Sequence, residues 1–264
     1  MGVSGMKVFC LRGRAAKITA AAGAILLLFA LMLIFGQQPQ PVAAVPAEAA
    51  AGRLVPVYEV ATEKQAVAIS FDASWGAEYT VQILDILDTY EAGATFFLVN
   101  IWLEDYPDMA REIAARGHEI GLHSVSHPHF TELNDEQILA ELQDNYQMIA
   151  DLTGHLPKLF RPPFGDYNSH VVEMVNSCGY QCIQWSIDSL DWQDLSAAEI
   201  TKRVLKDIHA GDIVLFHNNG LHTAEALPVI LEELGQRRLS VVGVSDLLLP
   251  GECYTDVNGV QRSK

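Results

Sequence analysis

The chain has 264 residues, of which 50% are hydrophobic and 19% charged, with 33 acidic against 17 basic residues. This apolar content can fill a core, so the composition excludes a chain that is disordered throughout. The net charge of −16 argues against a nucleic-acid partner, which would need a basic face to meet its phosphates. Four cysteines are too few for a small scaffold built on disulfides.

The N-terminal sequence is typical of a membrane anchor. Residues 1–17 form a basic segment, expected to be cytoplasmic, and residues 18–36 a transmembrane signal anchor. The apolar run from Ile18 to Phe35 would span roughly 27 Å as a helix, close to the hydrocarbon thickness of a bilayer. Positive charge before the run predicts a single pass with the rest of the chain outside the cytoplasm. The alternative is a cleaved signal peptide, because Ala-rich PVAAVPAEAAAG follows, and the protein would then be secreted.

The remaining chain is divided by composition. Residues 37–53 are rich in Gln, Pro and Ala and predict a linker. A folded domain is expected over 54–250, and the tail 251–264 is expected to be frayed.

Within the domain, short apolar runs alternate with amphipathic stretches. The apolar runs predict strands, and the stretches between them predict helices. Seven strands alternating with helices indicate a parallel α/β fold, either doubly wound or a barrel. The predicted strands are 66–72, 94–99, 118–123, 159–162, 182–187, 212–217 and 240–244, and the predicted helices are 79–91, 106–116, 134–153, 168–178, 196–209 and 223–236.

Ionisable residues lie at the carboxyl ends of five of these strands. In parallel α/β folds these ends share one rim, where chemistry collects. One such residue could be a capped or solvated strand end, but five on one rim predict an active site. The residues are Asp72, His123 with His127, Arg161, Asp188 with Asp191, and His217.

Several residue types in this set suit metal-assisted hydrolysis. His123 and His127 form an HxxxH pair, whose imidazoles can bind zinc or a similar divalent ion. Asp72, at the end of a buried strand, could act as a general base on a metal-bound water or merely cap the following turn. Arg161 could keep Asp72 ionised through a bidentate pair, or close a surface loop.

The remaining members suit a general acid. His217 ends an apolar strand, and Asp188 or Asp191 could orient it and raise its pKa. Trp185 and Trp192 flank these acids, and indole rings can stack on sugars, although each could be plain core.

The sequence resembles one known family at these positions. FDASWG, HSVSH, RPPFG, DSLDW and LFH occur in the order and spacing of the five motifs of polysaccharide deacetylases, which are carbohydrate esterase family 4 with a NodB-type domain. The resemblance covers about residues 65 to 245. It implies a distorted seven-stranded (β/α) barrel and metal-dependent removal of N-acetyl groups from chitin-like or peptidoglycan sugars.

The resemblance also implies roles for individual residues. Asp72 corresponds to the general base, braced by Arg161, and His217 to the general acid, with Asp191 as its partner. His123 and His127 correspond to ligands of a divalent metal, zinc or another such as cobalt. The remaining matches are substrate contacts: the backbone N–H of Phe164 near the oxyanion, and Trp192 and Leu215 around the acetyl group.

One position departs from the family pattern. The second acid of the first motif, which usually binds the metal, is Ala73 here. The FDxSWG form of the first motif resembles that of a subgroup linked to sporulation. Two functions are therefore expected: an extracytoplasmic deacetylase acting on an N-acetylated cell-wall or spore glycan, or a glycan-binding pseudoenzyme. Nothing in the sequence indicates a protein partner.

Overall fold

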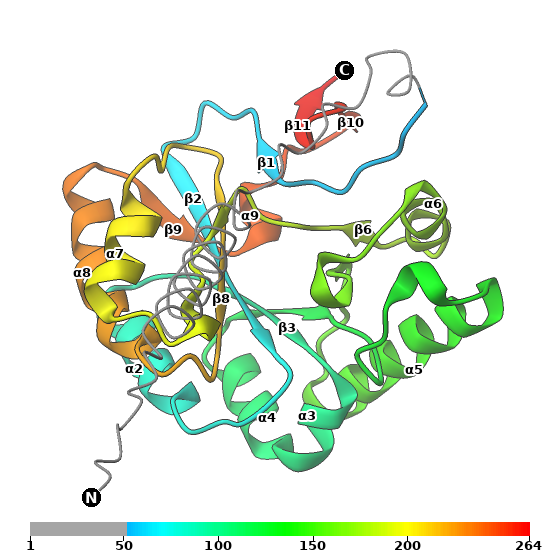
Figure 1. Ribbon diagram of the computed structural model, residues 1–264, viewed down its shortest axis with the longest axis horizontal. Helices are drawn as coiled ribbons and strands as arrows, with labels where there is room; N and C mark the ends of the chain where they lie inside the picture. Colours follow the sequence, from blue (N-terminus) through cyan, green and yellow to red (C-terminus); the bar gives the residue numbers. More distant parts are fainter. Residues whose placement is uncertain (1–51) are drawn as a thin grey trace, which may run out of the picture. The chain divides into compact units, whose positions relative to one another are not determined.

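The computed structural model describes residues 52–264. The predicted membrane anchor at 18–36 lies outside these residues, and no helix within 52–264 is long and apolar enough to cross a membrane. Two sheets and the helices around them make up the described part of the chain (Figure 1).

The larger sheet consists of eight short strands that all pair in parallel. Its spatial order is β6-β5-β4-β3-β2-β8-β7, and β9 also pairs with β2. The edge strands β6 and β7 do not pair with each other within the described chain, so the sheet curves into a half-barrel rather than a closed barrel. The strands are β2 Ala66–Ala73, β3 Thr95–Leu98, β4 Glu119–Leu122, β5 Leu159–Phe160, β6 Gln181–Cys182, β7 Ile187–Asp188, β8 Ile213–His217 and β9 Ser240–Val242.

Strand β2 pairs with three other strands, β3, β8 and β9, and is buried along its whole length. Its alternate residues face opposite sides. Val67, Ile69 and Phe71 join the large apolar cluster that packs against the helices, whereas Ala66 and Ala68 join a smaller cluster inside the half-barrel. This alternation directs the later residues Ser70 and Asp72 to the interior.

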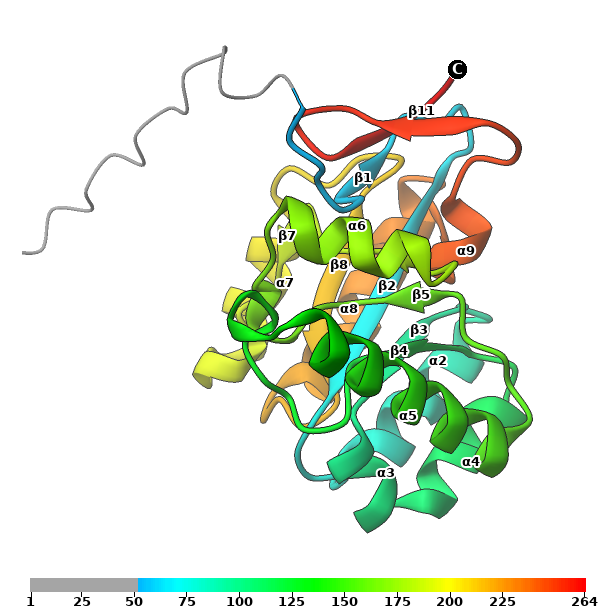
Figure 2. The same ribbon diagram turned by 90° about the vertical axis from the view of Figure 1, so that its right-hand side faces the viewer.

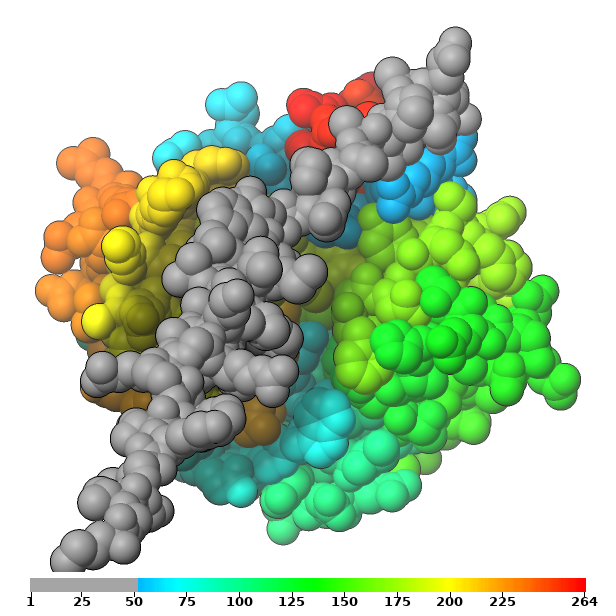
Figure 3. All heavy atoms as spheres, in the orientation of Figure 1, coloured from blue at the N-terminus to red at the C-terminus, as the bar shows by residue number. Residues whose placement is uncertain are grey.

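The helices pack around the sheet, with α5 and α6 on one flank and α7 and α8 on the other (Figures 1 and 3). All six predicted helices are confirmed to within a few residues. Two more were missed because they are too short for a clear periodic pattern, namely α3 and α9. The helices are α2 Thr80–Thr89, α3 Asn100–Asp105, α4 Pro107–Ala115, α5 Asp135–Thr153, α6 Ser169–Ser177, α7 Ala197–Leu205, α8 Thr223–Gln236 and α9 Val244–Leu247.

The strand predicted at 182–187 is wrong, because the chain there crosses between the two edges of the sheet. The N–H of Ile183 bonds to Phe160 in β5, whereas the N–H of Ser186 bonds to Ile213 in β8. The segment from Ile183 to Ser186 therefore cannot pair along its whole length with a single neighbouring strand. The structure therefore has two strands of two residues each, β6 and β7, in place of one.

The C-terminal residues are ordered rather than frayed. β10 Cys253–Thr255 and β11 Val260–Ser263 form a small sheet with β1 Glu59–Val60, in the order β1-β11-β10. Val257, Asn258 and Gly259 form the loop between β10 and β11, in which the N–H of Gly259 bonds to the Asp256 carbonyl at 2.9 Å and Gly259 has a φ of 84°. A three-residue hairpin loop commonly ends in a residue with left-handed backbone angles, which glycine adopts without strain. The small sheet lies at the end of the domain opposite α3 (Figure 2).

Candidate active site

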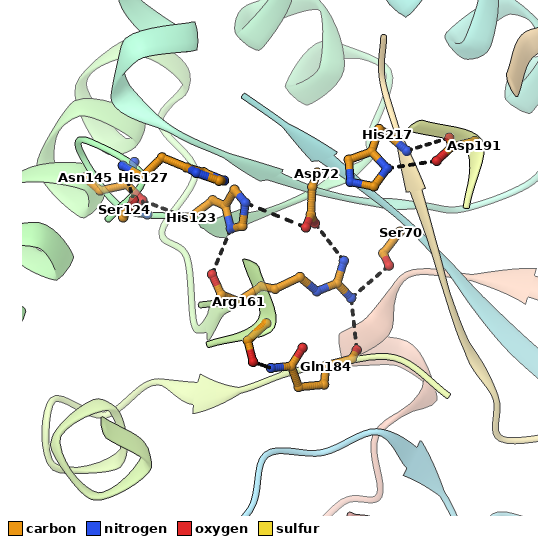
Figure 4. A network of polar contacts seen from close by, with 11 residues as sticks. Ser70, Asp72, His123, Ser124, His127, Asn145, Arg161, Gln184, Asp191 and His217 are labelled. Atoms are coloured by element: carbon orange, nitrogen blue, oxygen red, sulfur yellow. Dashed lines mark hydrogen bonds and ion pairs between the residues drawn. The ribbon is translucent and has the colours of Figure 1, made fainter. Parts of the chain in front are cut away.

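The carboxyl ends of neighbouring strands bring the predicted polar residues together (Figure 4). Asp72 and His217 lie opposite each other on β2 and β8. His123 directly follows β4, and Arg161 directly follows β5. Because these strands are parallel, their ends meet at one rim of the half-barrel.

Arg161 holds the carboxylate of Asp72, and both side chains are buried. Arg161 Nη1 donates to Asp72 Oδ1 at 2.8 Å, and Nη2 donates to Ser70 Oγ at 2.9 Å and to the carbonyl of Gln184 at 3.0 Å. The expected bidentate pair is therefore wrong, because Ser70 and Gln184 occupy the second nitrogen. Burial would raise the pKa of Asp72, but the charge and hydrogen bond of Arg161, together with the imidazoles of His123 and His217, outweigh burial and hold this pKa below its usual range. Asp72 is thus kept ionised.

Asp191 holds His217 in one orientation. Asp191 Oδ1 accepts a hydrogen bond from His217 Nδ1 at 2.8 Å. Its Oδ2 accepts from the backbone N–H of His217 at 2.8 Å and from Thr223 Oγ1 at 2.6 Å. Burial would lower the pKa of His217, but the hydrogen bond and charge of Asp191 raise it above the usual value. The other candidate, Asp188, instead accepts from the N–H of Leu190 at 2.9 Å.

The two histidines of the HxxxH pair lie side by side and are neutral. Their ring centroids are 5.1 Å apart. Burial lowers the pKa of both imidazoles, that of His127 to about 4. His123 Nδ1 lies 2.8 Å from the carbonyl oxygen of Arg161. Because a carbonyl only accepts, Nδ1 carries the proton and Nε2 carries a lone pair.

These donors fit a divalent metal ion. His123 Nε2 faces Asp72 Oδ2 at 3.6 Å, so two acceptors confront each other without a proton between them. Nδ1 of His127 is also buried, without a hydrogen-bond partner in residues 52–264. Neutral imidazoles beside a carboxylate are groups that bind zinc and similar ions. His123 and His127 are therefore the residues that would hold such an ion.

Position 73 supplies no further ligand. Ala73 is fully buried at the end of β2, in the apolar cluster that packs against the helices. Within residues 52–264, the only trio of potential ligand atoms that all lie within 4.8 Å of one another belongs to Glu59, His209 and Asp212. Asp212 directly precedes β8, so this trio lies at the other end of the half-barrel. Asp72 Oδ2 lies 3.6 Å from His123 Nε2, but Asp72, His123 and His127 do not bring three ligand atoms within 4.8 Å of one another.

The predicted substrate contacts differ in exposure. Phe164 is 60% exposed, and its ring packs edge-on against His127 with centroids 4.4 Å apart. Its backbone N–H has no acceptor among the hydrogen bonds of the described chain, so it is available to a bound oxygen. Trp192 is 57% exposed beside Asp191, whereas Leu215 is buried two residues before His217. Their contact with an acetyl group stays a prediction.

Sequence reasoning missed two residues of α5 that bond to the backbone of residues 123–126. Asn145 Oδ1 accepts from the backbone N–H of His123, and Glu141 accepts from the backbone of the residues that follow. One signal could have revealed Asn145, because it is a polar residue in the buried stripe of α5. The other members of this stripe are Ile138, Leu142 and Ile149.

Comparison with known proteins agrees with this geometry. The polysaccharide deacetylase family model matches residues 59–183. A peptidoglycan-N-acetylglucosamine deacetylase of Bacillus cereus is 35% identical over 196 residues, which cover 72% of this chain and 92% of the relative. An uncharacterised Bacillus subtilis protein, YlxY, is 32% identical over 193 residues, which cover 73% of this chain but only 60% of the relative.

Solved structures of both active and inactive members are similar to this chain. A wild-type pseudoenzyme of carbohydrate esterase family 4 from Bacillus anthracis matches with a TM-score of 0.71 and 29% identity, covering 78% of this chain and 70% of that chain. A mutant pseudoenzyme described as having restored enzymatic activity matches with a TM-score of 0.71 and 30% identity, over 78% and 72% of the two chains. The five motifs, the order of the parallel strands and these matches together show that the chain belongs to the polysaccharide deacetylase family, carbohydrate esterase family 4.

Proposed function

We propose that this protein is a deacetylase that removes N-acetyl groups from peptidoglycan-type amino sugars. One observation carries the proposal. Asp72 and His217 lie opposite each other on paired strands, and their pKa values are shifted in opposite directions. An ionised base beside a protonated acid is what amide hydrolysis needs near neutral pH. The Bacillus cereus relative supports the substrate class, because it acts on N-acetylglucosamine in peptidoglycan.

The residues of the site divide the reaction between them. Water adds to the acetamide carbonyl, the C–N bond breaks, and acetate and a free amine are released. Asp72 accepts the proton of the attacking water. His217 donates its Nε2 proton to the departing amine. The backbone N–H of Phe164 stabilises the negative charge that develops on the carbonyl oxygen.

The neighbours of these groups keep them in the required states. Arg161 is anchored by Ser70 and by the Gln184 carbonyl, so it cannot swing away from Asp72. Asp191 is fully buried and leaves only Nε2 of His217 free to exchange a proton. A divalent ion held by His123 and His127, zinc or another such as cobalt, would polarise the carbonyl and lower the pKa of the attacking water.

The proposal includes a location outside the cytoplasm. The basic residues 1–17 and the apolar run at 18–36 support a single-pass anchor with the domain on the outer side, or secretion if this segment is cleaved. A cell-wall or spore glycan would be within reach there. The FDxSWG motif supports a role in sporulation.

A second candidate function is a glycan-binding pseudoenzyme. Ala73 is the observation that favours it, because the site lacks a third metal ligand. The similarity to a solved pseudoenzyme of the family points the same way. In this case the exposed rings of Phe164 and Trp192 would bind sugar without turnover.

The test is release of acetate from N-acetylated chitooligosaccharides and peptidoglycan fragments, with added zinc, cobalt or chelator. Metal-dependent release that is lost in Asp72→Asn supports the deacetylase. Binding of the same sugars by folded protein without any release supports the pseudoenzyme instead.

A further inference from the structure

The segment from His123 to His127, here called the histidine segment, has an unusual backbone. Ser124 has a φ of 81° and His127 a φ of 56°. These angles lie in the left-handed region, which residues with a Cβ rarely adopt. Such a conformation persists only where surrounding contacts fix it.

Asn145 of α5 fixes the first half of the histidine segment. Its Oδ1 accepts from the backbone N–H groups of His123 at 2.9 Å and Ser124 at 3.1 Å. Its Nδ2 donates to the Leu98 carbonyl at 3.0 Å and to Asn100 Oδ1 at 2.7 Å. Asn145 is fully buried, and these four bonds use its whole hydrogen-bonding capacity.

Glu141, one helical turn earlier, fixes the second half. Its Oε2 accepts from the N–H groups of Val125 at 2.6 Å and Ser126 at 3.0 Å, and its Oε1 accepts from Ser126 Oγ at 2.7 Å. The N–H of His127 donates to Ser124 Oγ at 3.0 Å. Every backbone N–H of the histidine segment is therefore bonded, four of the five to side chains of α5 (Figure 4 draws the Asn145 end).

The two side chains differ in what else they contact. Asn145 also joins α5 to the end of β3, so its loss would weaken the fold as well as the site. Glu141 is half-buried, and all of its hydrogen bonds within residues 52–264 go to the histidine segment. Glu141 is therefore the better position at which to separate a role in the site from a role in folding.

We propose that Glu141 and Asn145 are positioning residues that set the geometry of His123 and His127 and thereby the affinity for a divalent ion. The inference rests on the proposed function, in which these two histidines hold the ion. Ligands already fixed by the fold lose less freedom on binding, so they bind more tightly. Because Ala73 offers no further ligand, the affinity depends on the geometry of this one pair.

The test is the dissociation constant for cobalt(II), measured on the full-length protein in detergent by competition with a coloured chelator. Glu141→Ala should weaken binding by about 10-fold, the lower end of the range for residues that support a metal ligand, because Glu141 acts on the histidines through the backbone of Val125 and Ser126. It should also change the visible spectrum of bound cobalt. Glu141→Gln should restore most of the affinity, because its amide oxygen still accepts the two N–H bonds. Asp144→Ala is the matched control, since Asp144 is an exposed acid of the same helix whose side chain does not contact the histidine segment.

Two results would overturn the proposal. In one, the Glu141→Ala variant binds cobalt as tightly as the unsubstituted chain, but its metal-free form unfolds at a lower temperature. This result would mean that Glu141 stabilises the fold and does not position the histidines. In the other, Glu141→Ala and Asp144→Ala weaken binding equally, which is an effect of net charge.

The cobalt affinities with and without Glu141→Ala are also compared in a chain that carries Ala73→Asp. This second comparison keeps the test of positioning separate from the test of the proposed function. No cobalt binding by the unsubstituted chain counts against metal-assisted deacetylation. A loss caused by Glu141→Ala in the Ala73→Asp background still supports positioning, and the absence of a loss there rejects it.

Discussion

Replacing Ala73 by Asp would add a carboxylate beside the base, at the position where the family usually has its second acid. Ala73 is fully buried among apolar side chains, so the new group would be desolvated in the metal-free protein. Keeping it protonated at pH 7, about three pKa units above its unperturbed value, costs roughly 4 kcal/mol. For a domain of this size each kcal/mol shifts Tm by about 2–4 °C, so the metal-free variant should melt roughly 8–16 °C lower.

Zinc should reverse much of this loss. An ion present at a hundred times its Kd stabilises the folded state by about 2.7 kcal/mol, which corresponds to roughly 5–11 °C. Thermal unfolding with and without zinc measures this recovery, and acetate release measures turnover, which should rise. Ala73→Asn is the control, since it has the same shape but cannot become an anion. An equal response to zinc in all three proteins, with no gain in turnover, would refute the view that a carboxylate at position 73 ligates the metal.

Three further substitutions test the rest of the site. Asp72→Asn removes the base, but the new amide oxygen still accepts a hydrogen bond from Arg161. Acetate release should therefore fall by about 10²–10⁴-fold while the circular dichroism spectrum is retained, and unchanged release would reject the role of Asp72. Asp191→Asn removes the charge that holds the pKa of His217 above 6.5, so the alkaline limb of kcat/KM should move to lower pH, and a limb that stays in place would exclude His217 as the acid. The same pair stabilises the fold below the unfolded pKa of His217 and loses this contribution as pH rises through the raised folded pKa, so Tm should decline over that range in the native protein but not in Asp191→Asn. Gly121→Ala would place a Cβ 2.5 Å from the ring of Phe97, which covers the Arg161 guanidinium at 4.1 Å, so stability should fall by roughly 1–3 kcal/mol and turnover with it. Gly235→Ala, at a helical glycine with open space, should leave turnover unchanged and raise stability slightly, by up to about 1 kcal/mol, and equal behaviour of the two variants would disprove the steric argument.

The sequence predicted best those features that burial imposes on the local residue pattern. Buried strands such as β2 and β8 are nearly continuous apolar runs, and a polar residue ending such a run marks the rim of the half-barrel. The contact of Asp72 with Arg161 could therefore be expected before the structure was known. The pattern left both Asp188 and Asp191 open as partners of His217, and only the family resemblance indicated Asp191.

The remaining features depend on contacts between distant parts of the chain. The break in the strand predicted at 182–187 arises because β5 and β8 bind the two ends of that segment separately. Gln184 contacts Arg161 through its backbone carbonyl, which any residue type supplies equally well. Glu141 contacts the histidine segment through two backbone N–H groups and the hydroxyl of Ser126, so neither histidine of the HxxxH motif points to it.

The small sheet of β1, β11 and β10 has a practical consequence for handling this protein. Glu59 of β1 bridges to Asp212, directly before β8, so the small sheet adjoins the start of that strand, whereas His217 ends it. A purification tag or surface linker attached after β11 would therefore project from the end opposite the rim (Figure 2). Protein immobilised in this way would keep its rim open to an insoluble polymer, which makes that attachment the better choice for assays on intact cell-wall material.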